Sequence, residues 1–426
     1  MGGVSTQKRL RVLLLAEAAN PEWVSVPLVG WSHAHALARL VDAHLVTQVR
    51  NREAILRTGL VEGRDFTAID SEAVSRPLWK AANLLRGGSG KGWTMVTAVE
   101  TISYYAYERL AWKLFGERIR AREFDLVHRI TPLSPTTPSL IARKCARAGV
   151  PFVLGPLNGG VPWPRAFDSA RRQEREWLSY VRDAYKLLPG FSSTREHAAA
   201  ILVGSKDTLE QVPARFRAKC RYVPENAIDP ARFHVRRTRR AQRPLRCVFV
   251  GRFVPYKGAD MLLEAAAPLL RAGALKLELI GDGPQRPLLE SIVEREQLAG
   301  SVTFAGWVEH ARVQHHLADS DLFVLPSIRE FGGGVVLEAL AVGLPAAVVA
   351  YGGPAELVTD DTGFLIELGP REAIVARLRA LLERVSADPQ LIEARVEPAL
   401  ARVAERFTWD AKAREVVGIY REILAR

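Results

Sequence analysis

The segment 330–338 reads Glu-Phe-Gly-Gly-Gly-Val-Val-Leu-Glu, so two carboxylates flank three consecutive glycines. It follows an apolar stretch and is predicted to open a helix. Glycines there remove side-chain bulk, so backbone N–H groups can approach a phosphate or a sugar closely. Glu330 precedes the helix and Glu338 lies within it, so the two carboxylates suit hydroxyls at opposite ends of one ligand. The pattern favours a polyol bound through its phosphates over a helix N-terminus with a merely favourable acidic neighbour.

Two cations and two glycines form a second pattern at 251–258, Gly-Arg-Phe-Val-Pro-Tyr-Lys-Gly, directly after an apolar stretch. Arg252 and Lys257 at the end of a strand, with a helix starting near Ala259, are typical of an anion site. Two solvated surface cations are the alternative. A third turn, Gly281-Asp282-Gly283-Pro284, is a weaker signal because it lacks the spacing of a dinucleotide fingerprint.

Short apolar stretches alternate with helical ones along the whole chain, which predicts a parallel α/β architecture. Strands that are apolar nearly throughout indicate burial on both faces. Helices are predicted at 259–272 and 284–298. The predicted strands are 10–16, 43–48, 125–129, 151–155, 200–203, 246–251, 275–280, 301–305, 321–325 and 346–350.

The stretch 236–246 has almost no apolar content and is interpreted as a surface linker. Each side of it is long enough for its own sheet. We therefore expect two Rossmann-like domains, the first spanning 1–235, that face each other across a cleft. Ligands of open α/β sheets bind at the carboxyl ends of the strands, where the glycine-rich segments lie.

The chain has 426 residues and a formal net charge of +12. Residues 1–235 hold 34 basic and 22 acidic residues, whereas residues 236–426 hold 25 of each. The surplus indicates an anionic partner: nucleic acid, an anionic membrane surface or a phosphorylated small molecule. Three widely spaced cysteines fit a reducing compartment. No run reaches the ~18 apolar residues of a spanning helix.

Taken in order, the motifs of the second half resemble those of the family 4 retaining glycosyltransferases, which have the GT-B fold. The segment Val223-Pro224-Glu225-Asn226 resembles the family's approach to the linker. The matching motifs are 251–258, 281–284, 321–327, the E-x7-E pair Glu330/Glu338, 352–356 and 407–410. The resemblance implies a nucleotide-sugar-binding domain at 236–407 and a final helix, 408–426, that returns to the first domain.

The resemblance also implies residue roles. Arg252 and Lys257 would hold the diphosphate of the donor and stabilise it as a leaving group, which is usually the largest catalytic term. Glu330 would act with them, holding the sugar hydroxyls, while Glu338 would bind the ribose. The implied donor-binding residues are Gly30, Gly251, Arg252, Lys257, Gly281, Gly283, Ser327, Glu330, Gly333, Gly334, Val335 and Glu338.

The sequence departs from the family pattern in three places. The loop after the family's first strand often has two glycines, where this chain has Gly30-Trp31. Phe331 follows Glu330 directly, so Gly332 takes the position at which the family has Phe. The family's His after the strand at 151–154 is absent, because 155–160 reads Gly-Pro-Leu-Asn-Gly-Gly. The candidate residues of the acceptor or cleft in the first domain are Trp31, His33, His128 and Asn158.

The prediction is a cytoplasmic hexosyltransferase that uses a nucleotide diphosphate sugar and needs no cofactor and no metal. The Asp319-Ser320-Asp321 pattern lies at a helix-to-strand junction, so we expect no metal role for it. The acceptor would be a glycan or a lipid-linked glycan, presented at an anionic membrane. The alternatives are a GT-B sugar phosphorylase, a nucleotide-sugar epimerase, a sugar-binding module without activity and a basic nucleic-acid-binding protein. No nucleic-acid recognition motif accompanies the basic residues.

Overall fold

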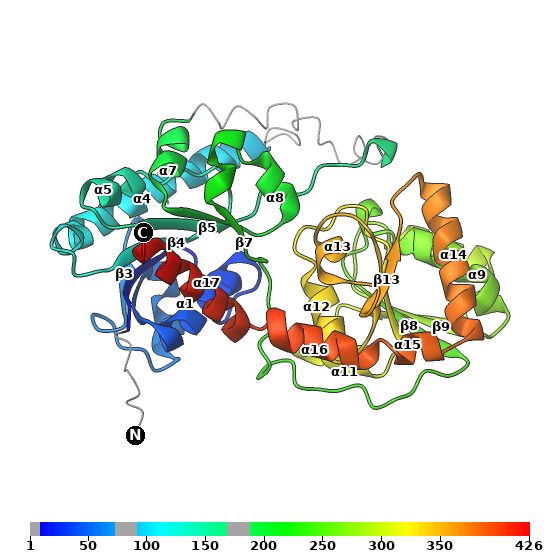
Figure 1. Ribbon diagram of the computed structural model, residues 1–426. Helices are drawn as coiled ribbons and strands as arrows, with labels where there is room; N and C mark the ends of the chain where they lie inside the picture. The colour runs from blue at the N-terminus through cyan, green and yellow to red at the C-terminus, as the bar shows by residue number, and fades with distance from the viewer. Residues whose placement is uncertain (1–8, 73–91, 168–187) are drawn as a thin grey trace, which may run out of the picture. The chain divides into compact units, whose positions relative to one another are not determined.

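The computed structural model describes residues 9–72, 92–167 and 188–426, and the chain forms two compact units (Figure 1). Unit 1 contains Met1–Gly159, Trp177–Glu225 and Lys412–Arg426; unit 2 contains Gly160–Glu176 and Asn226–Ala411. By these bounds the chain passes between the units four times. Among the described residues, no helix has both the length and the apolar character that crossing a bilayer requires.

Unit 1 is built on a seven-stranded parallel sheet in the order β3-β2-β1-β4-β5-β6-β7. Its central strands are buried on both faces, as parallel strands covered by helices must be. The strands are β1 (Arg11–Ala16), β2 (Asp42–Gln48), β3 (Phe66–Ile69), β4 (Leu126–Thr131), β5 (Phe152–Leu157), β6 (Ala200–Val203) and β7 (Cys220–Tyr222).

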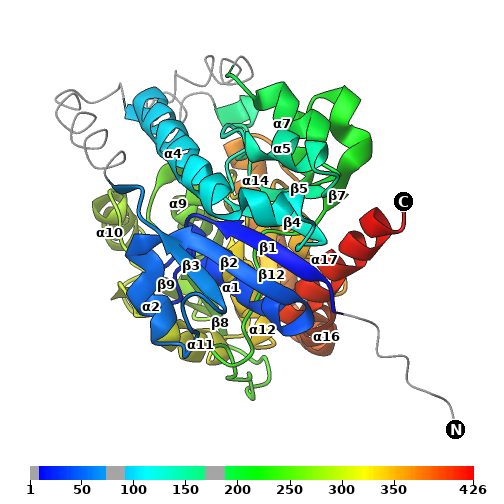
Figure 2. The same cartoon turned by 90° about the vertical axis from the view of Figure 1, so that its left-hand side faces the viewer.

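Helices cover both faces of this sheet (Figures 1 and 2). One face carries α4 (Gly92–Arg120), α5 (Ile141–Arg147) and α7 (Phe191–His197); the other carries α1 (Val26–Leu40) and α17 (Trp409–Leu424). Pro27 at the start of α1 suits a position whose N–H has no helical partner. The shorter helices are η1 (Val49–Asn51), α2 (Arg52–Leu56), α8 (Lys206–Gln211) and η4 (Ala214–Lys219).

Unit 2 has a six-stranded parallel sheet in the order β10-β9-β8-β11-β12-β13. The strands are β8 (Leu245–Val250), β9 (Leu275–Ile280), β10 (Val302–Gly306), β11 (Leu322–Leu325), β12 (Ala346–Val349) and β13 (Gly363–Ile366). The helices are η2 (Arg165–Phe167), η5 (Pro255–Lys257), α9 (Ala259–Arg271), α10 (Arg286–Arg295), α11 (His310–Ala318), α12 (Gly334–Ala341), α13 (Gly353–Leu357), α14 (Arg371–Ala387), α15 (Gln390–Glu393) and α16 (Val396–Arg406).

All ten predicted strands are confirmed, with ends that differ by at most two residues. Both predicted helices correspond to α9 and α10. Three strands escaped prediction: β3, β7 and β13. Each is three or four residues long and lies at the edge of a sheet.

The basic stretch 236–246 lies on the surface, but its interpretation as a linker was wrong. It belongs to unit 2, and alternate arginines point inward. Arg237 pairs with Asp321 and Glu393 at 3.2 and 2.8 Å, with 1% of its side chain exposed. Arg239 also donates to Asp321, which is fully buried. These ion pairs bind the stretch to unit 2.

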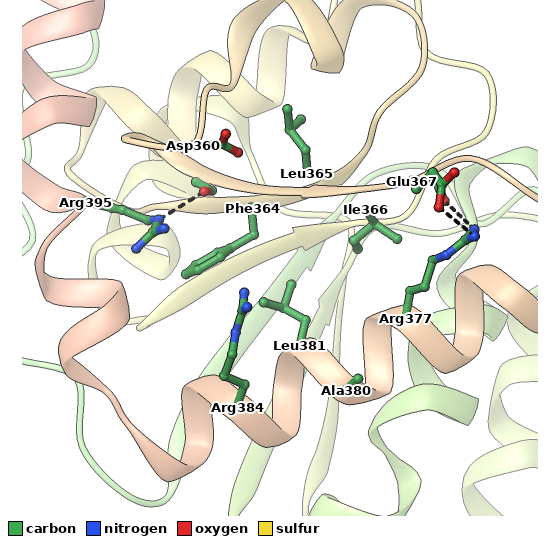
Figure 3. A pocket seen from close by; sticks show the side chains of 11 residues that line it. Asp360, Phe364, Leu365, Ile366, Glu367, Arg377, Ala380, Leu381, Arg384 and Arg395 are labelled. Carbon is green, nitrogen blue, oxygen red and sulfur yellow. Dashed lines mark hydrogen bonds and ion pairs between the residues drawn. The ribbon is translucent and has the colours of Figure 1, made fainter.

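Arginines also cap the outer edge of β13, beside a hollow of about 620 Å³ (Figure 3). Arg395 donates to the carbonyl of Gly363 at one end of the strand, and Arg377 donates to the carbonyl of Glu367 just beyond the other. Phe364 points toward Arg384 on α14. Because an unprotected edge strand can pair with another chain, this capping makes β13 a poor template for aggregation.

Candidate functional site

The loops that follow β8, β9 and β11 are hydrogen-bonded to one another at the carboxyl end of the second sheet. Gly251 N–H donates to Ile280 O at 2.9 Å, and Phe253 N–H donates to Asp282 O at the same distance. The carbonyl of Tyr256 accepts from Ile328 N–H at 2.9 Å and from the Ser327 hydroxyl at 3.0 Å. The motifs 251–258, 281–284 and 326–334 therefore form one continuous structure.

Glycine is required where these loops approach most closely. A Cβ on Gly281, which has φ +132°, would lie 2.0 Å from the carbonyl oxygen of Gly251. A Cβ on Gly353 would lie 1.8 Å from the oxygen of Phe331, and the Gly353 N–H donates to Glu330 O at 2.9 Å. Backbone oxygens cannot move aside as a flexible side chain does. The glycines hold the loops in contact and thereby fix the position of Glu330.

The two central charges of the motif pair with each other. The ammonium of Lys257 contacts the Oε2 atom of Glu330, and 17% of each side chain is exposed. Arg252 is exposed at the surface of the same loop. A phosphate placed here would meet two cations, and a neighbouring hydroxyl would meet a carboxylate. This arrangement fits an anionic, hydroxyl-bearing ligand.

The N-terminus of α12 lies on the same loop. Gly333 caps the helix with φ +56°, and Gly334 and Val335 form its first turn. N–H groups at such an end have no partner inside the helix and suit a phosphate. A Cβ on Gly332 would lie 2.1 Å from the amide nitrogen of Asn226. A side chain at this position, where the family pattern has Phe, would require the Asn226 side chain to move.

Two of the predicted donor residues have structural contacts of their own. Ser327 is fully buried, and its hydroxyl donates to the backbone of Tyr256. A Cβ on Gly283 would lie 2.5 Å from the oxygen of Phe253. The Ser327 hydroxyl thus joins two loops by a hydrogen bond, and the missing side chain of Gly283 lets two loops pack closely. The proposed contact of both residues with a ligand would come through the backbone.

Glu338 has a partner that the motif did not predict. Its Oε1 lies 2.7 Å from Nε2 of His310, the first residue of α11. This hydrogen bond raises the pKa of His310 although its partial burial opposes the shift. His310 thus holds the carboxylate that the resemblance assigns to the ribose. No feature of the sequence around His310 predicted that it contacts Glu338.

Residues 161–163 were also missed, because the sequence assigned them to the first domain. They belong to unit 2. Arg329 donates to Val161 O at 3.0 Å, and its guanidinium lies 5.2 Å from the Trp163 ring centre. Trp163 packs edge-on against Tyr256 at 6.0 Å between ring centres. Trp163 therefore contacts both motif loops.

Gly30, which the resemblance assigns to the donor site, lies in the second turn of α1, which begins at Val26. A Cβ on Gly30 would lie 2.1 Å from the carbonyl oxygen of Ala18 and 2.9 Å from the Thr131 side chain. The glycine is needed so that the loop after β1 can pack on the helix. Packing within unit 1 therefore explains why position 30 is glycine, and no contact with a diphosphate is needed to account for it.

Three of the four candidates for the acceptor or cleft, Trp31, His33 and His128, are buried. Trp31 stacks on His35 at 5.0 Å between ring centres. His33 packs edge-on against His128 at 5.8 Å. The ring nitrogens of His128 lie 2.5 Å from Tyr420 Oη and 2.6 Å from Gly155 O, and burial lowers its pKa to about 4. Sequence position could not show that His128 points into the interior.

Asn158, the fourth candidate, lines a hollow and anchors a buried carboxyl group. Its side-chain amide donates to Glu225 Oε2 at 2.5 Å. Burial raises the pKa of Glu225 to about 7. Lys412 of α17 donates to the Glu225 carbonyl at 2.6 Å, and burial lowers the pKa of its ammonium to about 7. This contact attaches α17 to unit 1.

Within the described residues, no cluster of three or more His, Cys, Asp and Glu side chains could hold a metal ion. Asp321, from the pattern 319–321, is committed to arginines. It accepts from Arg237, Arg239 and the backbone N–H of Arg246. Its function is to stabilise the fold of unit 2.

Two parallel α/β units, the second with glycine-rich loops at the carboxyl ends of its strands, define the GT-B fold. Solved structures support the fold. A glycosyltransferase of Rickettsia africae superposes with a TM-score of 0.61 at 14% identity, over 98% of this chain and 99% of that one. HepE of Anabaena in complex with UDP gives 0.60 at 15% identity, over 97% and 100%.

Residues 232–395 match the family model described as glycosyl transferases group 1. Alpha-D-kanosaminyltransferase of Streptomyces kanamyceticus is 30% identical over 53% of this chain and 61% of its own. The putative colanic acid biosynthesis glycosyltransferase WcaL of Salmonella typhimurium is 29% identical over 63% and 66%. The chain thus spans under two thirds of the length of these relatives.

Proposed function

We propose that this chain is a retaining, metal-independent hexosyltransferase of family 4. It would transfer a hexosyl unit from a nucleotide diphosphate sugar to an acceptor hydroxyl. The observation that carries the proposal is the gathering of Arg252, Lys257, Glu330 and the α12 N-terminus on hydrogen-bonded loops. Glu338 lies on the same helix. HepE, which shares the fold, is described in complex with UDP, which supports a nucleotide donor.

In the proposed reaction the acceptor oxygen forms a bond to the anomeric carbon while the bond from that carbon to the diphosphate breaks. Arg252 and Lys257 neutralise the charge that develops on the departing diphosphate. The diphosphate accepts the proton of the acceptor hydroxyl on the same face. His128 offers no alternative base, because both ring nitrogens have buried partners. Trapping a covalent glycosyl–enzyme adduct would refute this same-face mechanism.

Lys257 connects the two halves of the donor in this proposal. Its ammonium has three N–H groups, so it can contact Glu330 and a phosphate oxygen together. Glu330 then stays in place to accept from a sugar hydroxyl. Loss of Lys257 would leave Glu330, which is mostly buried, without its cation.

Thermal unfolding of the purified chain with UDP, GDP, ADP and their sugars tests the proposal. A donor at 100 times its Kd stabilises the fold by about 2.7 kcal/mol, and the true donor should stand out from the others. Lys257→Ala and Glu330→Ala should each lower turnover by orders of magnitude. Lys276→Ala removes an exposed lysine from β9 and should leave turnover unchanged. Near-normal rates in both site variants would refute the assignment.

We also propose that the acceptor belongs to polysaccharide or lipid-linked glycan synthesis at an anionic membrane. The family and the WcaL likeness support the first part, and the basic surplus of residues 1–235 supports the second. Arg118, Arg120 and Arg122 at the end of α4 are the cluster to neutralise. If the triple glutamine variant binds anionic liposomes as tightly as the unmodified chain, this cluster does not bind membranes.

A further inference from the structure

The hollow beside β13 in unit 2 is lined by three arginines and two acidic residues (Figure 3). Its volume of about 620 Å³ lies within the range of small-molecule pockets, roughly 300–1,000 Å³. The donor loops, 251–258, 281–284 and 326–334, contribute none of its lining residues. The charged residues that line it are Asp360, Glu367, Arg377, Arg384 and Arg395.

Two of the arginines lie against the same aromatic ring. The guanidinium of Arg395 lies 4.3 Å from the ring centre of Phe364, and that of Arg384 lies 6.0 Å from it. Arg384 reaches the ring from α14, and Arg395 reaches it from the residue before α16 (Figure 3). Arg395 also donates to the carbonyls of Gly363 and Leu391, at 3.0 and 2.6 Å. The ring thus brings together two positive charges, which repel each other.

Neither of these two charges is neutralised by an ion pair. Within the described part of the chain, no carboxylate pairs with Arg384 or Arg395, whereas Arg377 in the same hollow pairs with Glu367 at 2.6 Å. Burial lowers the pKa of Arg395, and the charge of Arg384 lowers it further. The carboxylates at 360 and 361 act in the opposite direction and do not outweigh them. The hollow therefore has two cations available for an anionic ligand.

A phosphate monoester matches these two cations in charge. It carries about −1.5 to −2 at pH 7 and offers three strong acceptor oxygens, whereas a carboxylate neutralises one cation. Guanidinium groups bind phosphate oxygens through two parallel hydrogen bonds. The side chain of Arg384 makes no hydrogen bond within the described residues, and its contact there is the ring of Phe364. Its N–H groups can therefore all turn to a phosphate.

The hollow is larger than a phosphate group alone requires. Ile366, Ala380 and Leu381 line it together with the arginines. These side chains offer apolar surface to a carbon skeleton that carries the phosphate. The size and the mixed lining thus favour an organic phosphate over inorganic phosphate.

A peptide strand added to the open edge of β13 fits the hollow less well. Arg395 donates to the carbonyl of Gly363, and Arg377 donates to the carbonyl of Glu367. A partner strand needs backbone carbonyls such as these for its own N–H groups. Since arginines already bind them at both ends of β13, the edge offers little ladder to a peptide.

We propose that this hollow is a binding site for an organic phosphate monoester, with Arg384 and Arg395 on the phosphate and Ile366, Ala380 and Leu381 against the carbon skeleton. The bound phosphate removes the repulsion between the two arginines. The site shares no residue with the donor loops, and the proposal does not rest on the proposed transferase reaction.

Calorimetric titration of the full chain with glucose 6-phosphate, glycerol 3-phosphate and AMP tests the proposal. Glucose, glycerol and adenosine are the uncharged counterparts, and sodium sulfate is the simple anion. At least one ester should bind more tightly than both its counterpart and sulfate. Arg384→Gln should weaken that binding about 10-fold or more, as expected for hydrogen bonds to a charged group. Arg295→Gln, which removes an exposed arginine of α10, should leave it unchanged.

The stability of the unliganded Arg384→Gln variant gives an independent readout. The substitution removes one of two repelling charges and breaks no hydrogen bond within the described residues. The urea midpoint of unit 2 should therefore not fall. A lower midpoint would assign Arg384 to packing on Phe364 and would overturn the proposal.

Two further arms identify where the phosphate binds and what carries it. Arg252→Ala removes an exposed cation of the donor loops and should leave ester binding unchanged. Vesicles that contain phosphatidic acid present the same phosphate on a lipid; binding to them alone, lost in Arg384→Gln, would identify a lipid headgroup as its source. Ester binding lost in Arg252→Ala, sulfate binding as tight as that of the esters, or no binding of any ester, phosphatidic acid included, would refute the site.

Discussion

Replacing Gly30 by alanine distinguishes two roles for this glycine. The family resemblance implies that it binds the donor diphosphate, whereas the structure shows that it lets the loop after β1 pack on α1. The added Cβ would lie 2.1 Å from the carbonyl oxygen of Ala18, far inside contact distance, and 2.9 Å from Thr131 Cγ2. Overpacking of a tight core costs about 1–3 kcal/mol. Here a backbone oxygen held by Thr131 must move, so the upper part of that range applies. Alanine regains about 0.5–1 kcal/mol of helix propensity, which leaves a net loss of about 2 kcal/mol.

Equilibrium urea unfolding measures this loss, with the transition of unit 1 followed by circular dichroism. Gly418→Ala is the matched control, because Gly418 also lies inside a helix of unit 1 and its Cβ would meet no atom within 4 Å. It should be neutral or stabilise by up to about 1 kcal/mol. If Gly30→Ala unfolds like the unmodified chain but binds UDP less tightly, the packing argument is refuted and the diphosphate role of Gly30 is supported.

Three further outcomes follow from buried or paired charges. Asp321→Ala leaves Arg237 buried without its inner partner, so unit 2 should lose about 3–5 kcal/mol in urea unfolding; a loss under about 1 kcal/mol would contradict this. The depressed pKa of Lys412, about 7, makes the folded chain bind fewer protons than the unfolded one between pH 7 and roughly 10. Stability should therefore rise over that window, and Lys412→Met should flatten the rise; an unchanged pH slope would count against it. The raised pKa of His310 has the opposite sign: its contribution is complete below pH ~6.5 and is lost as the pH rises through the folded pKa. His310→Gln should thus lower the urea midpoint more at pH 6 than at pH 9, and equal losses would disprove the link.

The sequence predicted the strands that lie inside the sheets much better than those at the edges. Interior strands such as β1 and β11 are buried on both faces and nearly all apolar, which leaves a continuous apolar run in the sequence. An edge strand has one open side and needs little length. The three strands that escaped prediction, β3, β7 and β13, are short and lie at edges, and their residues give no comparable signal.

The donor loops were predictable for a related reason. Turns that bring backbone close to backbone need glycine, so Gly281 and Gly353 mark them in the sequence. Contacts made by ordinary residues leave no such mark. Trp163 reaches Arg329 from more than 160 positions away in the chain, and His310 reaches Glu338 from another helix. Spacing along the chain could not predict either pair.

Position at a strand end also failed to predict which way a side chain points. His128 was placed near the substrate because it lies in β4, yet it faces inward to Tyr420 of α17, 292 residues later. His128 is enclosed on this side because α17 packs against unit 1 and places Tyr420 beside it. A contact made by the last helix of a chain lies beyond any argument from local pattern.

The basic surplus of the first domain takes on a different meaning once its arginines are placed. Arg129 and Arg195 are buried, and both donate hydrogen bonds to backbone carbonyls. Arg118 pairs with Glu123 and lies against the rings of Phe115 and Phe124. Since part of the surplus is used for packing, the formal +12 overstates the attraction that an anionic surface would feel. The exposed arginines, not the net charge, decide whether this domain binds membranes.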